Sequence, residues 1–145
     1  MRPTSVLAHS AELFLDETFQ IELQEVRDEQ LISNTGVSLY GENEIKLVLE
    51  SALKPDVIQL PLNILDTRLY HHGTLGQLAD EGIEIHARSV FLQGLFFLSE
   101  SDFKNRFSDV VPCLEKLKLV AAEAGLTLAE LSLLWLVSLK EVNKV

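Results

Sequence analysis

The sequence has very little cysteine and is short of basic residues, and each shortage excludes a class of protein. A single cysteine, Cys113, cannot form a disulfide within the chain, and this composition fits a reducing cytoplasm. The 145 residues include 12 lysines and arginines against 22 acidic residues, which gives a net charge of −10. Nucleic acids and anionic membranes bind clustered positive charge, so we expect neither as a partner. Cys113 falls in a helical pattern, where we expect a small buried or half-buried residue rather than a nucleophile.

The sequence also lacks an apolar run long enough to span a bilayer. Residues 90–98 are apolar but far too short, and residues 126–139 are interrupted by threonine, serine and glutamate. Few apolar residues follow Met1, so we expect no signal peptide. We therefore expect a cytoplasmic globular protein with one ordinary domain, which buries about two thirds of the surface of its unfolded chain.

The sequence does contain four short apolar or β-branched segments, each followed by a polar residue and a helical pattern. We expect a β-strand in each, at residues 4–8, 34–38, 56–60 and 83–88. The polar residues that end or follow these segments are His9, Ser38, Gln59 and Arg88. Alternating strands and helices form a parallel sheet, whose ligand sites lie beyond the carboxyl ends of its strands. The sequence therefore predicts that the four side chains line one rim of the fold.

Helical periodicity continues between and beyond these strands. It predicts helices over residues 18–29, 42–53, 75–81, 101–106 and 111–124, and another that begins at residue 127. The last of these starts with a capping box that joins Thr127 to Glu130. It is apolar over most of its circumference, so we expect it to pack between other elements. The tail, residues 140–145, fits the start of a further strand.

At the strand ends the sequence resembles the aldo-keto reductases, which reduce carbonyl groups with NADPH inside an eight-stranded β/α barrel. The resemblance rests on four segments, in the order Leu7–Glu12, Gly36–Tyr40, Val57–Asp66 and Ala87–Leu95. It covers nearly the whole chain, which would correspond to strands four to seven of the barrel, with strand eight beginning at Val145. It implies an α/β fold: a partial (half) β/α barrel of the TIM type, with four parallel strands and their helices in a single domain over residues 1–145.

The resemblance also implies roles for particular residues. His9 matches the histidine of the family's Asp-Tyr-Lys-His catalytic set, which orients the substrate carbonyl. Ser38 and Gln59 match residues that hydrogen-bond the nicotinamide carboxamide, a group with both a donor and an acceptor. Arg88 stands where many members stack a tyrosine on the nicotinamide ring. The loop that passes beside the cofactor ribose and pyrophosphate is matched at Ser89, Leu92, Gln93 and Gly94.

Departures from the family pattern limit what the chain can do alone. The catalytic Asp, Tyr and Lys come from earlier strands and have no counterpart here, and Tyr40, the only tyrosine near a strand end, lies on the wrong strand. Leu39 replaces an asparagine, so one polar cofactor contact is missing. The adenosine-phosphate site would lie beyond Val145. The resemblance thus implies NADP-dependent oxidoreduction of an aldehyde or ketone as the parent activity. For this isolated chain we expect weak or absent NADP binding and no useful catalysis.

Two hypotheses for the chain stay open. In the first, the chain is a piece of a full-length reductase. In the second, it is a freestanding half-barrel without catalysis that serves as a binding or assembly module. The coding sequence upstream of Met1 distinguishes them, because an in-frame Asp, Tyr and Lys there would make the chain a fragment.

The predicted half-barrel also implies self-association. Four strands taken from a barrel leave two sheet edges and an apolar inner face, on which we expect Val57 and Ile85 to be exposed. We therefore expect a homo-oligomer, with a dimer favoured. The terminal helix, with Trp135 and Leu139, would contribute to the same interface.

Simpler interpretations of the site residues also stay open. His9 would suit the capping of the loop that follows it, and Ser38 would suit the start of a turn. Arg88 would be neutralised by an ion pair with Glu84 or with an acid on a neighbouring loop.

The other histidines point to structure rather than to a metal site. His86 alternates with Arg88 along its strand, which fits an inward-facing structural residue. His71 and His72 resemble a metal-binding pair only superficially, because adjacent side chains point in different directions. We expect them to lie in a solvated loop, and we expect no metal.

Overall fold

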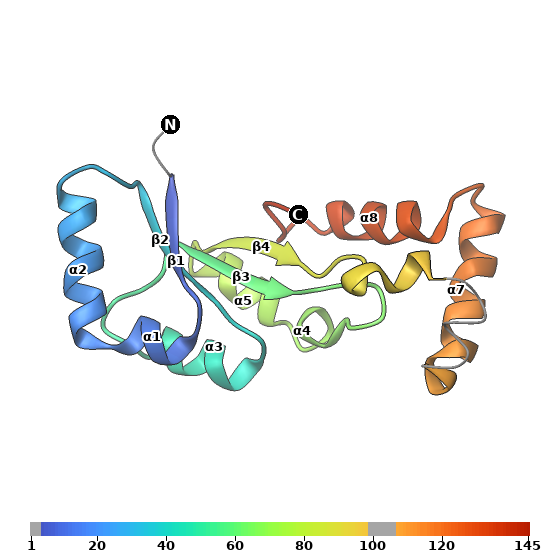
Figure 1. The fold of residues 1–145 in the computed structure, drawn as a ribbon, viewed down its shortest axis with the longest axis horizontal. Coiled ribbons are helices and arrows are strands. Elements are labelled where there is room, and N and C mark those ends of the chain that lie inside the picture. The colour runs from blue at the N-terminus through green and yellow to red at the C-terminus, as the bar shows by residue number, and fades with distance from the viewer. Residues whose placement is uncertain (1–3, 99–106) are drawn as a thin grey trace.

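Four parallel strands form one sheet in the computed structural model, which describes residues 4–98 and 107–145 (Figure 1). The strands are β1 (Ser5–Ala8), β2 (Asn34–Ser38), β3 (Val57–Pro61) and β4 (Glu84–Arg88), and they pair in the order β1-β2-β3-β4. All three pairings are parallel. This confirms the predicted α/β fold, and each strand agrees with its predicted range to within one residue at either end.

Strand register divides the sheet into two different faces. Val37, Ile58 and Ile85 lie in register and are fully buried in the main core, together with apolar residues of the surrounding helices. Because side chains alternate along a strand, the residues between them turn to the opposite face. That face carries mainly polar side chains at the carboxyl ends of the strands: Ser38, Gln59, His86 and Arg88.

The expected exposed apolar inner face is therefore wrong. Ile85 is in register with Ile58 on the helix-covered face, and both Ile85 and Val57 are 0% exposed. Val57 does lie on the opposite face, but β2 approaches it closely at Gly36, a residue without a side chain. Ile85 is an odd number of residues from Arg88 along the same strand, so the two side chains lie on opposite faces of the sheet.

The helices of the first half follow the strands. They are α1 (Ala11–Leu15), α2 (Glu17–Asp28), α3 (Glu42–Leu49), α4 (Arg68–His71) and α5 (Thr74–Asp80). Periodicity predicted α2, α3 and α5. It did not predict α1 and α4, because helices of five and four residues are too short to show a repeat.

Helix α3 ends at Leu49, four residues before the predicted end at Leu53. The hydroxyl of Ser51 lies 2.8 Å from the Val48 carbonyl oxygen and 2.7 Å from the Leu53 carbonyl oxygen. These side-chain contacts compete with the helical backbone pattern, which is how serine favours helix ends and turns.

Among its described residues, the second half contains two 3₁₀ segments, η1 (Leu92–Phe97) and η2 (Ser108–Val110), and two helices, α7 (Val111–Glu123) and α8 (Leu128–Ser138). In Figure 1, α7 lies at the end of the molecule opposite α2. The predicted helix over residues 101–106 lies outside the described residues. On α7, Cys113 is exposed rather than buried, because the next residue, Leu114, is the one that faces the core.

Helix α8 begins with the predicted capping box. The Thr127 hydroxyl accepts a hydrogen bond from the Glu130 amide at 3.2 Å, and Glu130 accepts one from the Thr127 amide at 2.7 Å. Leu136 and Leu139 are buried, but Leu134 is 51% exposed. The helix therefore packs on one side only, which corrects the expectation that it lies between other elements.

The tail runs parallel to β4, as the sequence predicted for the start of a further strand. Lys144 forms a parallel bridge with His86, and the Ala87 amide donates to the Lys144 carbonyl at 2.8 Å. The Asn143 side chain accepts a hydrogen bond from the Ile85 amide at 2.7 Å. The tail thus covers part of the edge of β4.

Within residues 4–98 and 107–145, no single helix is long and apolar enough to cross a membrane. Residues 108–123 and 128–138 together have the length and apolar composition of a membrane span, but the two helices are bent by 83° relative to each other.

Candidate functional site

A hollow of about 370 Å³ opens where the four strands end. It is lined by Leu7, Ala8, His9, Ser38, Tyr40, Gln59 and Arg88. The four polar residues predicted to share a rim therefore do lie together, one from the end of each successive strand. A parallel sheet places these ends side by side, and this explains the convergence of residues that are far apart in sequence.

Ser38 and Gln59 are direct register partners on neighbouring strands. The Leu39 amide donates to the Gln59 carbonyl at 2.9 Å, which keeps the two strand ends together. A hydroxyl and an amide side by side can both donate and accept, and these are the groups that a carboxamide such as that of nicotinamide requires. The Leu39 side chain is fully buried, so it adds no polar contact to the hollow.

His9 is exposed at the end of β1 and lines the hollow. The simpler interpretation, that it caps the following segment, is wrong, because Ser10 does so. The Ser10 hydroxyl accepts a hydrogen bond from the Leu13 amide at 3.2 Å and begins α1. The turn after Ser38 is likewise held by another residue, since Glu44 accepts hydrogen bonds from the amides of Tyr40 and Gly41.

Arg88 lies over the ring of Tyr40, with its guanidinium carbon 4.2 Å from the ring centre. One terminal nitrogen makes a long contact of 3.5 Å with the Leu39 carbonyl. Its Nε is buried and has no hydrogen-bond partner. In the part of the chain that the structure describes, no carboxylate forms an ion pair with Arg88.

Glu84, the proposed partner of Arg88, pairs with other residues instead. Its Oε1 lies 2.6 Å from the Lys144 ammonium and 2.9 Å from the His86 Nε2. The contact with Lys144, and after it the contact with His86, lowers the pKa of the Glu84 carboxyl. His86 thus has the inward-facing structural position that the sequence predicted.

The loop after β4 adopts a strained backbone. Ser89, Leu92 and Gln93 have φ values of 62°, 48° and 56°, and Gly94 has φ of 90°. A left-handed conformation costs a residue with a side chain about 1 kcal/mol, and such strain clusters at ligand-binding loops. These four residues match the cofactor loop expected from the sequence, but they lie outside the set that lines the hollow.

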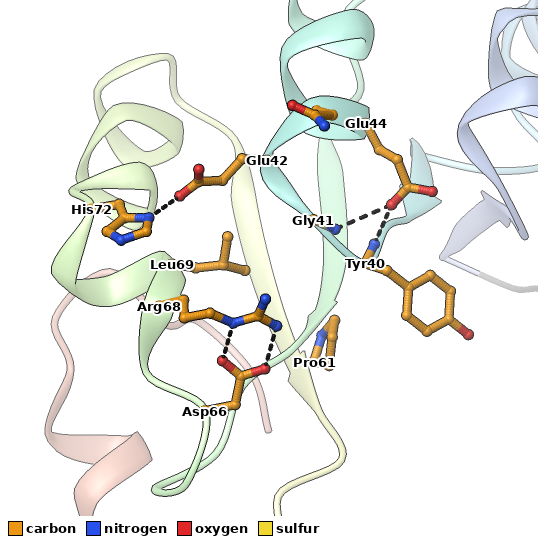
Figure 2. Close-up of a pocket in the computed structure, with 10 residues that line it drawn as sticks. Tyr40, Gly41, Glu42, Glu44, Pro61, Asp66, Arg68, Leu69 and His72 are labelled. Atoms are coloured by element: carbon orange, nitrogen blue, oxygen red, sulfur yellow. Dashed lines mark hydrogen bonds and ion pairs between the residues drawn. The ribbon is translucent and has the colours of Figure 1, made fainter.

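A second hollow, of about 460 Å³, lies beside the first and shares Tyr40 with it (Figure 2). It is formed by the loops after β2 and β3 and by α3 and α4. Figure 2 shows Arg68 paired with Asp66 through two contacts, of 2.7 and 2.8 Å. The bond to Arg68 lowers the pKa of Asp66. Sequence reasoning missed this hollow, because α4 was not predicted.

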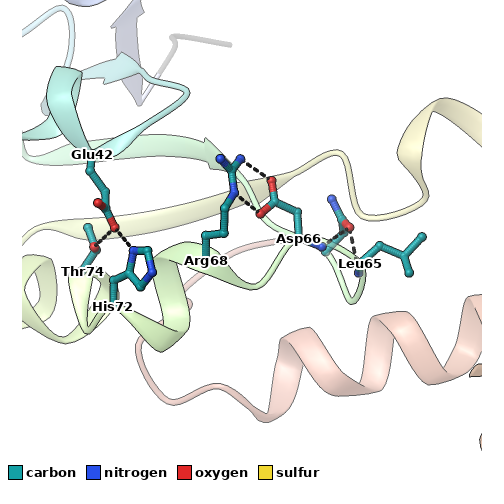
Figure 3. Close-up of polar contacts among 7 residues, drawn as sticks. Glu42, Leu65, Asp66, Arg68, His72 and Thr74 are labelled. Carbon is teal, nitrogen blue, oxygen red and sulfur yellow. Dashed lines mark hydrogen bonds and ion pairs between the residues drawn. The ribbon is translucent and has the colours of Figure 1, made fainter. Parts of the chain in front are cut away.

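The charged side chains of the second hollow are engaged in contacts with neighbouring residues (Figure 3). His72 Nδ1 lies 2.5 Å from Glu42 Oε1, which also accepts a hydrogen bond from the Thr74 hydroxyl at 3.3 Å. Asn63 turns the chain toward Asp66 by accepting hydrogen bonds from two following amides. These internal pairs leave Arg88 as the better candidate for binding a charged ligand.

His71 and His72 lie at the end of α4 rather than in a loop, although both are exposed as expected. The sequence predicted a loop at these two residues because α4 is only one turn long and leaves no helical pattern. The second hollow was not predicted for the same reason. Across the described ranges, no group of three or more histidine, cysteine or acidic side chains is placed to hold a metal ion.

Two comparisons with known proteins, one with family models and one with solved structures, give matches. The family model described as "Aldo/keto reductase family" matches residues 5–145. Among the matching solved structures is a thermostable aldo-keto reductase, Tm1743, in complex with the inhibitor epalrestat. The TM-score is 0.65 with 25% sequence identity, over 97% of this chain and 47% of that one. The chain thus spans about half the length of that structure. Comparison with curated proteins gives no match.

Proposed function

The chain belongs to the aldo/keto reductase family, and from that premise we propose that it carries half of a carbonyl-reducing site that uses NADP. Its four parallel strands and helices are part of the family's β/α barrel. The proposal treats residues 1–145 as one partial-barrel domain, and the single cysteine favours a cytoplasmic setting.

One observation carries this proposal: His9, Ser38 and Gln59 line the same hollow although each comes from a different strand. Ser38 and Gln59 supply the donor and acceptor that fit a nicotinamide carboxamide, and we assign them to it. His9 is assigned to the orientation of the substrate carbonyl. NADPH, when bound, supplies the hydride. Ser89, Leu92, Gln93 and Gly94 are proposed to follow the cofactor as a preformed loop, which their left-handed backbone supports.

We further propose that the 145-residue chain does not reduce carbonyls by itself. Proton transfer to a carbonyl needs an acid within hydrogen-bonding reach. The chain has two tyrosines. Tyr40 lines the hollow, but its ring lies under Arg88, and Tyr70 lies outside the hollow, edge-on to Trp135 at 6.3 Å. We assign the proton donor to neither. The expected result with NADPH and a panel of aldehydes is a rate no higher than that of His9→Ala. Turnover well above that control would contradict the proposal.

Binding of NADP tests the cofactor assignment directly. Calorimetric titration is expected to give a dissociation constant of about 1 mM, roughly 4 kcal/mol of binding. Ser38→Ala and Gln59→Ala should each weaken binding by about fivefold, the worth of one hydrogen bond. Ser33→Ala and Gln77→Ala are matched controls, because both residues are exposed and lie outside the hollow.

Two outcomes of this titration would contradict the assignment. Micromolar affinity would mean that a separate phosphate site dominates binding. Affinity unchanged by Ser38→Ala and Gln59→Ala would mean that the hollow does not hold the nicotinamide end.

The alternative, a non-catalytic half-barrel that acts as a binding or assembly module, is favoured by the surface of α8. Leu133, Leu134 and Val137 are 39%, 51% and 56% exposed on one side of this helix. Such a patch is typical of an interface between subunits. We propose that it pairs with a second copy of the chain in a two-fold dimer. Trp135 and Leu139 would then support the interface from the core, since they pack inward.

A further inference from the structure

We infer that the Arg88 guanidinium makes the hollow favour the reduced cofactor, so that the chain binds NADPH more tightly than NADP⁺. This inference rests on the proposed function, because it takes Ser38 and Gln59 to hold the nicotinamide carboxamide. It adds to that function a preference for one redox form of the same cofactor.

The first support is the place of the Arg88 guanidinium among the strand ends. Arg88 belongs to β4, but its side chain extends past the end of β3 to the segment that follows β2. One terminal nitrogen lies 3.5 Å from the Leu39 carbonyl oxygen, and the guanidinium carbon lies 4.2 Å from the centre of the Tyr40 ring. Leu39 directly follows Ser38, and its amide donates to the Gln59 carbonyl at 2.9 Å. The guanidinium therefore lies beside the Ser38–Gln59 pair, and all three side chains line the same hollow.

The second support is the closeness of a carboxamide to the ring that carries it. The nicotinamide ring is bonded directly to its carboxamide, so a ring held through Ser38 and Gln59 would lie next to the guanidinium. In NADP⁺ this ring is a cation, and in NADPH it is neutral. The two forms carry the same phosphates, so the ring is the part whose charge changes. A difference between their affinities therefore reports the electrostatic surroundings of the ring.

The third support is the positive charge that Arg88 brings to the hollow. The seven residues that line the hollow include Arg88 but no aspartate or glutamate. Glu84, on the same strand and face, is held by Lys144 and His86. In the described part of the chain, Arg88 has no ion pair. A like charge nearby disfavours the charged form of a group, so this guanidinium should disfavour the cationic ring.

The expected effect of Arg88 is a ratio of two dissociation constants. Two positive charges in near contact at a protein surface repel enough to change an affinity by about tenfold. We therefore expect NADPH to bind about tenfold more tightly than NADP⁺, a difference of about 1.4 kcal/mol. Reduction of a carbonyl requires that NADPH bind and that NADP⁺ leave, and the charge of Arg88 would favour both.

The test compares the two dissociation constants in NMR titrations of the full 145-residue chain with NADPH and with NADP⁺. Arg88→Gln should bring their ratio close to one, because it removes the charge. Arg88→Lys should keep most of the ratio, because it retains the charge and loses only the flat guanidinium. Arg68→Gln is the matched control and should leave the ratio unchanged, since that exposed arginine pairs with Asp66 in the second hollow.

Salt provides a second measurement that needs no variant. In the unmodified chain, the ratio should fall as salt is raised from about 0.05 M to about 0.5 M, because ions screen the repulsion between the ring and Arg88. The phosphates respond to salt in the same way in both forms, so their contribution cancels in the ratio.

Four outcomes would overturn the inference. In the unmodified chain, these are equal or tighter binding of NADP⁺ and a ratio that does not respond to salt. In the variants, they are a ratio that survives Arg88→Gln and a ratio that Arg88→Lys abolishes as fully as Arg88→Gln does. Failure of the proposed function shows separately, as binding of both cofactor forms that does not depend on Ser38 and Gln59.

Discussion

Gly36 lies where β2 runs close against its neighbours, and the lack of a side chain there is a structural requirement. A Cβ at this position would clash with the Val57 carbonyl oxygen and would lie 3.0 Å from Val57 Cβ and 3.1 Å from Leu7 Cγ. The first of these atoms belongs to a strand backbone that cannot move without disturbing the sheet. The same close approach keeps Val57 buried on the face that carries the hollow.

Gly36→Ala is therefore expected to lower the free energy of unfolding by about 1–3 kcal/mol, the usual cost of overpacking. Gly76→Ala is the matched control. That glycine lies inside α5, and a Cβ added to it would have nothing within 4 Å, so alanine should raise the free energy of unfolding by about 0.5–1 kcal/mol. Urea unfolding followed by circular dichroism measures both. Equal stability of Gly36→Ala and the unmodified chain would contradict the close approach.

At the scale of residues, the sequence predicted the shared rim but not the contacts made on it. His9, Ser38, Gln59 and Arg88 were placed on one rim because strand ends in a parallel sheet must meet. The stacking of Arg88 on Tyr40 was not predicted. It depends on how two loops fold over the rim, and no periodic pattern reports that.

At the scale of elements, strands were predictable and the shortest helices were not. Each strand is a β-branched or apolar run with polar flanks, and this pattern can be recognised in a segment of only four or five residues. A helix needs about two turns before its repeat shows, so α1 and α4 left no pattern. With α4 unseen, the second hollow and the contact of His72 with Glu42 could not be anticipated.

The tail is held beside β4 by an ionic contact as well as by backbone hydrogen bonds. Lys144 and His86 both contact Glu84, and they lower the pKa of its carboxyl. A carboxyl whose pKa is lowered by folding stabilises the fold at a pH above its pKa in the unfolded chain. That stabilisation is lost as the pH falls through the lowered pKa of the folded state.

Lys144→Gln is expected to raise the pKa of Glu84 toward its ordinary value, because Lys144 is the larger cause of the shift. The part of the acid loss of stability that comes from Glu84 should then be smaller than in the unmodified chain, because its pKa values in the folded and unfolded states lie closer together. Carboxyl NMR of Glu84 and unfolding curves between about pH 2 and 6 measure the two effects. Lys118→Gln, which removes a lysine paired with Glu115 on α7, should leave Glu84 unchanged. An unchanged Glu84 titration in Lys144→Gln would show that the tail does not reach this carboxylate in solution.

At the scale of the whole molecule, the main departure from expectation concerns the inner face of the sheet. It is lined by polar groups at the strand ends, so apolar exposure there gives no drive toward association. Exposed apolar residues occur on several helices, and three of them, Leu133, Leu134 and Val137, share one side of α8. Sequence could not decide which side of this helix faces outward, because the helix is apolar nearly all round.

The proposed dimer predicts that the double variant Leu134→Gln, Val137→Gln sediments as a monomer while the unmodified chain sediments as a dimer at low micromolar concentration. The reason is that burial of apolar surface, at about 25 cal/mol per Å², would no longer favour the contact. Ile21→Gln is the control, because Ile21 is 61% exposed on α2, at the other end of the molecule (Figure 1). A monomeric unmodified chain would rule out the homodimer.

The division of the sheet into two faces has a consequence for how this protein can change over generations. Alternate positions of the same strand serve different demands: Val37, Ile58 and Ile85 hold the core, while Ser38, Gln59 and Arg88 line the hollow. A substitution at Ser38, Gln59 or Arg88 removes no core contact. Ligand preference can therefore change at these positions while the protein stays folded. A library randomised at those three codons should yield mostly soluble protein, whereas one randomised at the first three should not.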